Sequence, residues 1–268
     1  MAITFGAVPH TDDETTRVLL ADFCDVLSSR AGIAVAPHRS PSPKALASAF
    51  QRGRVDIAWT SPILFVTSAA FVDCVPLVST VRQGEATYSG VLYVPADSPL
   101  RHVEQLRGSR VAWVARTSAA GYVMPRLALH DAGIDTAGFF GEETFGDTHG
   151  EVVRRVRAGE ADVGATYAVI RPSDDGPEIV QAAFDAADAH VLLVSRPIPS
   201  DLMVVQARVP ELARTRLTNA LLGDDPRLAR LCAALFDAQG YRPFEAGPFE
   251  ALKRELECCE PIPWSQSA

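Results

Sequence analysis

Hydroxyl-bearing residues stand at three junctions where a predicted strand runs into a predicted helix. The first N–H groups of a helix have no acceptor within the helix, and they favour an anion. Hydroxyls placed beside them therefore predict a site that holds a small oxyanion with uncharged donors. For each hydroxyl the alternative is a helix N-cap with no ligand role. The three junctions are Thr60-Ser61, Thr117-Ser118 and Thr148-His149.

The elements that must position these residues alternate between strand and helix. Short apolar runs at 3–8, 33–37 and 55–59 are separated by helical patterns that stop near Gly32 and Gly53. A capping box at 11–14 begins the first helix. The middle of the chain repeats the alternation, with strands predicted at 88–94, 110–114, 162–167 and 190–195. This order predicts parallel α/β layers, in which ligands bind beyond the carboxyl ends of the strands.

Composition excludes several classes of protein. The chain has 268 residues, of which 47% are hydrophobic and 22% charged, enough apolar content for a folded core. A net charge of −8 without a basic cluster argues against nucleic-acid partners and anionic membranes. No apolar run has the ~18–20 residues of a spanning helix, so we expect no membrane insertion. We expect a cytoplasmic location for the sequence as it stands, and a periplasmic or cell-surface one if a leader was removed.

Signals of an enzyme are sparse. The sequence has no GxSxG elbow, Walker A motif, GxGxxG loop or HExxH motif, and its six histidines form no metal-like pair. Five cysteines without framework spacing indicate free, structural thiols. We therefore expect no catalytic residues, no metal and no cofactor, and a binding protein rather than an enzyme.

Four segments in order resemble one family: 53–66, 86–114, 117–135 and 144–168. Together they are similar to the phosphate/phosphonate solute-binding proteins of ABC importers, the phosphonate-binding type. The resemblance implies a type II periplasmic-binding-protein fold, with two α/β lobes and a ligand cleft between them that closes at a hinge. It places lobe one at 1–86 and 198–268 and lobe two at 87–197. The implied partners are a small anionic, phosphate- or phosphonate-like ligand and a transporter permease.

The resemblance also singles out an anion loop. The family has Ser-x-Ser-Gly-Tyr where this chain has Ser118, Ala119, Ala120, Gly121 and Tyr122. Ala120 replaces the second serine, and a lost neutral donor to a buried anion costs ~1–3 kcal/mol unless another group fills in. The backbone N–H groups of this loop remain available to an anion.

Further candidates each have a structural alternative. Tyr88 matches an aromatic of the family's crossover strand and walls the cleft, or it is a half-buried strand residue. His149 pairs with an anion when protonated, or it caps a helix. Asp162 holds a ligand amine, or it ties its loop to a backbone N–H. Pro9 and His10 follow the first strand at the expected cleft edge, where His10 is a ligand residue or an ordinary loop histidine.

Two other functions use the same fold. One is a cytoplasmic enzyme of cofactor or metabolite biosynthesis, which the free cysteines and the missing leader favour. The other is a sensing module that reports a ligand to a partner protein. The missing catalytic constellation and the four family-like segments favour the solute-binding protein.

Overall fold

The computed structural model describes residues 2–8, 13–174 and 176–258, and the chain within them forms two compact units. Unit 1 comprises the chain up to Ala86 and Pro199–Lys253, and unit 2 comprises Thr87–Ile198 and the chain from Arg254. Helix α8 (Ala246–Cys258) is thus divided between the units, whereas the sequence prediction kept the whole C-terminal segment in lobe one. No helix in these ranges is long and apolar enough to cross a bilayer.

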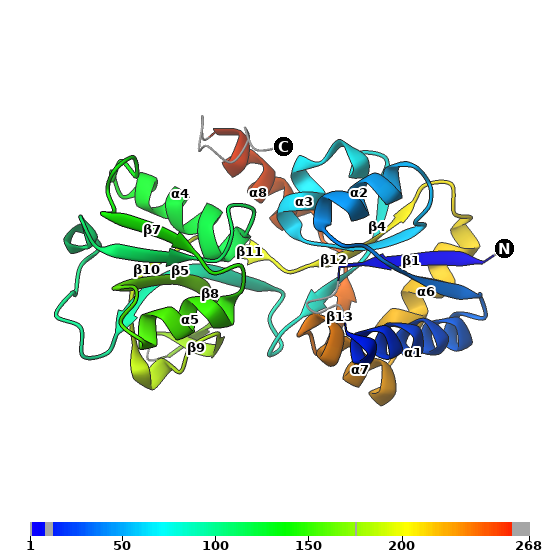
Figure 1. Ribbon diagram of the computed structural model, residues 1–268. Helices are drawn as coiled ribbons and strands as arrows, with labels where there is room; N and C mark the ends of the chain where they lie inside the picture. The colour runs from blue at the N-terminus through cyan, green and yellow to red at the C-terminus, as the bar shows by residue number, and fades with distance from the viewer. Residues whose placement is uncertain (1, 9–12, 175, 259–268) are drawn as a thin grey trace. The chain divides into compact units, whose positions relative to one another are not determined.

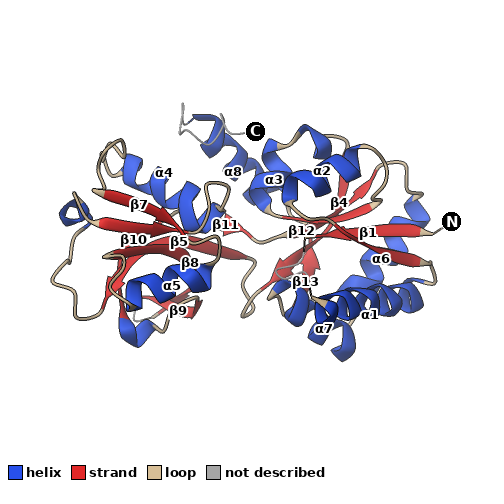
Figure 2. Cartoon of the chain, viewed as in Figure 1, coloured by secondary structure: helices blue, strands red, loops and turns tan. Residues whose placement is uncertain are grey.

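Unit 1 is a six-stranded sheet with the order β13-β4-β12-β3-β1-β2. Strands β1, β2 and β3 are parallel, and β12 runs antiparallel to β3. The elements, coloured in Figure 2, are β1 (Ile3–Ala7), α1 (Glu14–Ala31), β2 (Val35–Arg39), α2 (Pro43–Gln51), β3 (Ile57–Thr60), α3 (Pro62–Thr67), η1 (Ala69–Phe71), β4 (Cys74–Val81), β12 (Leu202–Gln206), α6 (Glu211–Leu222), α7 (Pro226–Phe236) and β13 (Gly240–Pro243).

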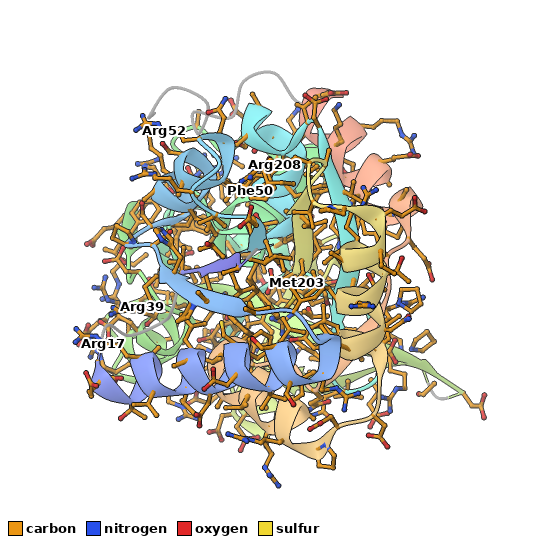
Figure 3. The ribbon with its side chains drawn as sticks, turned by 90° about the vertical axis from the view of Figure 1, so that its right-hand side faces the viewer. Arg17, Arg39, Phe50, Arg52, Met203 and Arg208 are labelled. Carbon is orange, nitrogen blue, oxygen red and sulfur yellow. The ribbon has the colours of Figure 1, made fainter. Side chains whose placement is uncertain are left out.

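Helices cover both faces of this sheet (Figure 1). Helices α1, α6 and α7 pack one apolar cluster against it, and α2 and α8 contribute to a second cluster on the other face. Phe50 and Met203 are buried in these clusters, and the buried apolar area of the clusters stabilises the unit by roughly 25 cal/mol per Å². In Figure 3, Phe50 and Met203 lie within the outline of the unit, and Arg17, Arg39 and Arg52 lie toward its edge.

Unit 2 is a seven-stranded sheet whose main path is β10-β5-β8-β6-β7. Strands β6, β7 and β8 are parallel, and β5 runs antiparallel to β8. The elements are β5 (Thr87–Pro95), η2 (Val103–Leu106), β6 (Arg110–Trp113), η3 (Ala119–Val123), α4 (Met124–Asp131), β7 (Glu142–Phe145), α5 (His149–Arg157), β8 (Val163–Ser173), β9 (Gly176–Ala182), η4 (Ala186–Asp188) and β10 (Ala189–Val194); β11 (Ile198–Pro199) follows.

The local signals for helix starts agree with the structure where it describes them. Ser42 and Ser61 accept backbone N–H groups at the starts of α2 and α3, each followed by a proline at the first helical position. Asp13 is the N-cap of α1 and accepts the N–H of Thr16. The sequence prediction had assigned this cap to Thr11, which lies outside the described residues.

Two aspartates close the amino edges of the two sheets in the same way. Asp56 directly precedes β3 and accepts the N–H of Thr4 in the neighbouring β1 at 2.9 Å. Asp162 directly precedes β8 and accepts the N–H of Arg110 in the neighbouring β6 at 2.9 Å. An arginine pairs with each carboxylate at 2.7 Å: Arg208 with Asp56, and Arg110 with Asp162. Both aspartates therefore hold adjacent parallel strands together.

The Arg110 hydrogen bonds lower the pKa of Asp162, which makes the contribution of this carboxylate to stability depend on pH. We predict that Asp162→Asn lowers the free energy of unfolding at pH 7 by up to about 1 kcal/mol, because the pair is partly exposed. A carboxylate whose pKa is lower in the folded state stabilises the fold fully at pH values above its ordinary pKa of about 4. This stabilising free energy is lost as the pH falls through the pKa of the folded state. Urea unfolding at pH 7 and pH 3 should show the deficit at pH 7 and a smaller one at pH 3. The same change at exposed Asp97 should have no effect, and an equal deficit at both pH values would contradict the prediction.

Candidate functional site

The carboxyl edge of the unit 2 sheet gathers most of the residues predicted from the sequence. Because β6 and β7 are parallel with Trp113 opposite Phe145, the turns that follow them leave the sheet side by side. Strand β8 is parallel to β6, and β5 is antiparallel to β8, so β5 begins at this same edge. The edge therefore carries Tyr88, the loop from Thr117 to Gly121, and His149.

Ser118 is both a helix cap and a candidate donor. Its Oγ accepts the N–H of Gly121 at 3.1 Å, which makes it the N-cap of the π-helical turn η3. A serine hydroxyl can accept one hydrogen bond and donate another, so capping leaves its O–H proton for a ligand oxygen. Ala119 and Ala120 come next and are the first residues of the helical segment, where N–H groups lack intrahelical acceptors. The cap and site interpretations are therefore compatible.

Gly121 seats this turn against the sheet. Its carbonyl accepts the N–H of Val114 at 3.1 Å. A Cβ at this position would overlap the side chain of Val114 and lie 2.9 Å from the Ser118 Oγ. The turn also packs closely on β5, since a Cβ at Gly90 would lie 2.8 Å from the carbonyl oxygen of Ala120. Only the smallest residue allows this contact, which explains the glycine of the loop.

Tyr122 has a buried side chain. Only 1% of the residue is exposed, and its ring packs against Trp113 and Phe145 at centroid distances of 5.2 and 5.6 Å. Its hydroxyl instead accepts a hydrogen bond from Arg116 Nη1 at 3.1 Å. The tyrosine predicted as a ligand residue thus supports the neighbouring arginine from inside the core.

His149 is the first residue of α5, after the cap Thr148. Its Nδ1 lies 2.7 Å from the Oγ1 of Thr166, a fully buried residue of β8. The imidazole also meets the ring of Tyr167 edge-on at 5.0 Å. These contacts hold the ring in one orientation at the carboxyl edge. Sequence reasoning missed Thr166. The only indication that the sequence gives of it is that a polar residue stands inside an otherwise apolar, buried strand.

Tyr88 lines a pocket of about 490 Å³ within unit 2. The other walls come from the adjoining ends of β5, β8, β9 and β10, and the apolar ones include Ile170, Pro172 and Val194. The pocket lies where β5 begins, on the strand next to β8, which carries Thr166.

In unit 1 the corresponding edge carries Thr60 and Ser61. Thr60 is buried at 2% exposure, whereas Ser61 is exposed and accepts the N–H of Leu64 as the cap of α3. Ser200, which sequence reasoning missed, precedes β12 at this edge, because Leu202 pairs with Thr60. Its Oγ is buried and has no hydrogen-bond partner among the described residues. A buried unpaired hydroxyl is uncommon, because most buried polar groups in proteins are hydrogen-bonded.

Two groups of predicted residues are not brought to these edges. Asp162 lies at the amino edge of unit 2, bound to Arg110, so the structure favours its alternative role as a loop tie. Pro9 and His10 lie outside the described residues.

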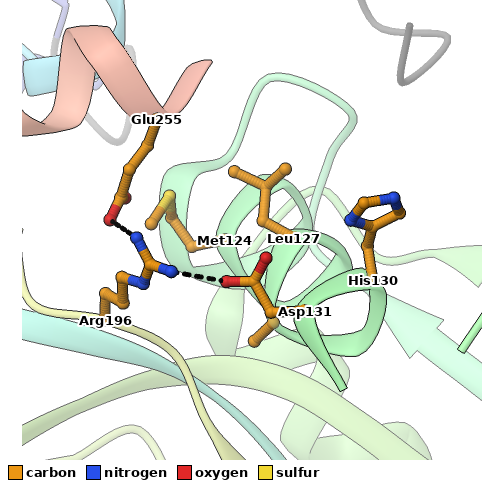
Figure 4. Close-up of a pocket in the computed structure, with 7 residues that line it drawn as sticks. Met124, Leu127, His130, Asp131, Arg196 and Glu255 are labelled. Carbon is orange, nitrogen blue, oxygen red and sulfur yellow. Dashed lines mark hydrogen bonds and ion pairs between the residues drawn. The ribbon is translucent and has the colours of Figure 1, made fainter. Parts of the chain in front are cut away.

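A second pocket of about 200 Å³ in unit 2 lies elsewhere (Figure 4). Arg196 bridges Asp131, the last residue of α4, and Glu255 of α8, at 3.0 and 2.9 Å. The pocket runs along α4 from Met124 to Asp131, and the two carboxylates neutralise the charge of Arg196.

Comparison with known proteins decides the family. The sequence matches, over residues 5–247, the family described as ABC transporter, phosphonate, periplasmic substrate-binding protein. The chain belongs to this family.

Solved structures of low sequence identity share the two-lobed fold of this family member. XAC2383 from Xanthomonas citri, bound to ATP, has 22% identity and a TM-score of 0.74, with 96% of this chain and 97% of that chain covered. PhnD1 from Prochlorococcus marinus, in complex with methylphosphonate, has 14% identity and a TM-score of 0.73, covering 97% and 99%. The aliphatic sulphonate binding protein SsuA from Escherichia coli has 17% identity and a TM-score of 0.57, covering 96% and 86%. The family match confirms the solute-binding role predicted from the sequence, and these structures confirm the α/β fold.

The close fit of Gly121 predicts that a side chain at this position destabilises the protein. We expect Gly121→Ala to lower the free energy of unfolding by about 1–3 kcal/mol, because the added methyl overlaps Val114. Gly150→Ala is the matched control, since a Cβ there meets nothing within 4 Å and alanine favours a helix. Thermal melts of both variants measure the difference. Equal melting temperatures would show that the η3 turn adapts to a side chain.

Proposed function

We propose that this solute-binding protein captures a small phosphate- or phosphonate-like anion at the carboxyl edge of unit 2. The observation that carries the proposal is the loop after β6, where a serine hydroxyl and the first N–H groups of a helical segment stand together. His149, held by Thr166, stands at the end of the neighbouring β7–α5 turn. These are the donors that a tetrahedral oxyanion requires.

Unit 1 carries its own candidate donors at the carboxyl edge of its sheet: Thr60, Ser61 and the buried hydroxyl of Ser200. Hinge closure around the ligand is the way in which such proteins retain a solute. The partner is then a permease that accepts the closed, loaded form, and the place of action is the outer side of the cytoplasmic membrane. The pocket beside Tyr88 supports a ligand with an organic substituent rather than a bare ion.

The first test is direct titration. The wild-type protein titrated with methylphosphonate, and separately with inorganic phosphate, should give saturable heat for one site and a higher melting temperature. Binding to the folded state raises stability as RT ln(1 + [L]/Kd), so ligand at about 100 times Kd adds about 2.7 kcal/mol. Absence of heat and of a thermal shift at millimolar ligand would contradict the proposed ligand class and leave the fold untouched.

The second test separates the roles of Ser118. We predict that Ser118→Ala weakens methylphosphonate binding by roughly 5- to 30-fold and also lowers stability by about 1 kcal/mol, since one hydroxyl both donates and caps. Ser68→Ala is the control, because Ser68 caps η1 by accepting the N–H of Ala70 at the far end of α3. It should lower the melting temperature and leave affinity unchanged. Unchanged affinity in Ser118→Ala would make Ser118 a cap only.

A further inference from the structure

Arg116 is the cation nearest along the chain to the anion loop. It lies between the end of β6 and the cap Ser118, at the carboxyl edge of unit 2. Its guanidinium carbon is 4.7 Å from the ring centroid of Phe145 and 5.8 Å from that of Tyr122. Its Nη1 donates to the Tyr122 hydroxyl at 3.1 Å. Two aromatic rings and one hydrogen bond thus orient a charged side chain on the protein surface.

This charge is not neutralised within the described part of the chain. No carboxylate there lies within 4.0 Å of Arg116, whereas Arg110, Arg126 and Arg196 of the same unit pair with carboxylates at 2.7 to 3.0 Å. Arg107 resembles Arg116 in that it stacks on a ring, Phe139, at 5.0 Å and has no ion pair within the described residues. Arg107 lies before β6, at the amino edge, so of these two arginines only Arg116 adds its charge to the proposed site.

The geometry leaves most of the guanidinium donors for a ligand. Arginine has five N–H donors in a planar fork, of which the Tyr122 hydroxyl takes one. A fork of this kind binds two oxygens of a tetrahedral oxyanion at once. Ala120 stands where the phosphonate-binding family has a serine, so one neutral donor is missing from the loop. A charged donor forms a hydrogen bond roughly twice as strong as a neutral one and can replace it.

We propose that Arg116 is a ligand-binding residue that selects oxyanions with two negative charges over singly charged ones of the same shape. The inference rests on the proposed function, and it adds a specificity determinant that neutral donors cannot supply. Attraction between a cation and an anion scales with the charge of the anion, whereas the hydroxyl and backbone donors discriminate less by charge. A phosphonate or phosphate monoester therefore gains more from Arg116 than a sulfonate does.

The experiment compares methylphosphonate with methanesulfonate, which share a methyl group and a tetrahedral head but differ in charge. Wild type, Arg116→Gln, Arg116→Lys and Arg107→Gln are titrated with both anions at pH 8, where the phosphonate is mainly doubly charged. Arg116→Gln should weaken methylphosphonate binding by roughly 10- to 100-fold and methanesulfonate binding by a much smaller factor. Arg116→Lys, which keeps the charge and loses the fork, should recover part of the methylphosphonate affinity. Arg107→Gln should change neither affinity.

The outcomes separate this inference from the function on which it rests. If wild type binds methylphosphonate and Arg116→Gln behaves like Arg107→Gln, the role of Arg116 is wrong and the solute-binding site stands. Equal losses for both anions would also overturn charge selection, and would assign Arg116 to positioning the loop. If wild type binds neither anion, the proposed ligand class fails and the inference fails with it. A preference for methylphosphonate that disappears in Arg116→Gln supports the proposal.

Discussion

The contact between Gly121 and Val114 is the constraint on which the candidate site of unit 2 depends. Because position 121 has no side chain, the turn after β6 lies directly against Val114, and the Gly121 carbonyl accepts the N–H of Val114 at 3.1 Å. That placement puts Ser118 at the start of the helical segment and pushes the next residue, Tyr122, into the core. Tyr122 in turn supports Arg116 at the surface. One small residue thus orients a cap, a buried ring and a cation.

The charges and dipoles close to the candidate site, rather than the net charge of the chain, set the electrostatic field that an anion meets there. A net charge of −8 repels an approaching oxyanion, but this repulsion is screened over a Debye length of about 8 Å at physiological salt. Within that distance the field is set by the helix N–H groups, the hydroxyls and Arg116. At the amino edge of unit 2, Arg110 and Asp162 neutralise each other. At the edge where the strands end, Arg116 has no carboxylate within 4.0 Å among the described residues.

The two units close the amino edges of their sheets with the same hydrogen-bonding arrangement. Asp56 and Asp162 each stand before a strand and bind the N–H of the parallel neighbour, with an arginine against the carboxylate. This tie closes the amino edge and leaves the opposite edge, with its strand-to-helix turns, for polar side chains. The cysteines are separate from this arrangement: burial raises the pKa of the Cys24 thiol to about 12, so it is not a nucleophile.

The sequence by itself determined the features that arise from neighbouring residues. Caps such as Ser42 and Ser61 with a following proline, and the alternation of strands and helices, depend on contacts within a few positions, which sequence patterns express. The side of the sheet to which a residue belongs was decided only by tertiary structure. Strand direction places Asp162 at the amino edge, and packing on Trp113 buries the ring of Tyr122. Arg116 and Thr166 gained their partners, Phe145 and His149, from strand register between distant segments, because register brings together residues whose sequence separation carries no signal of contact.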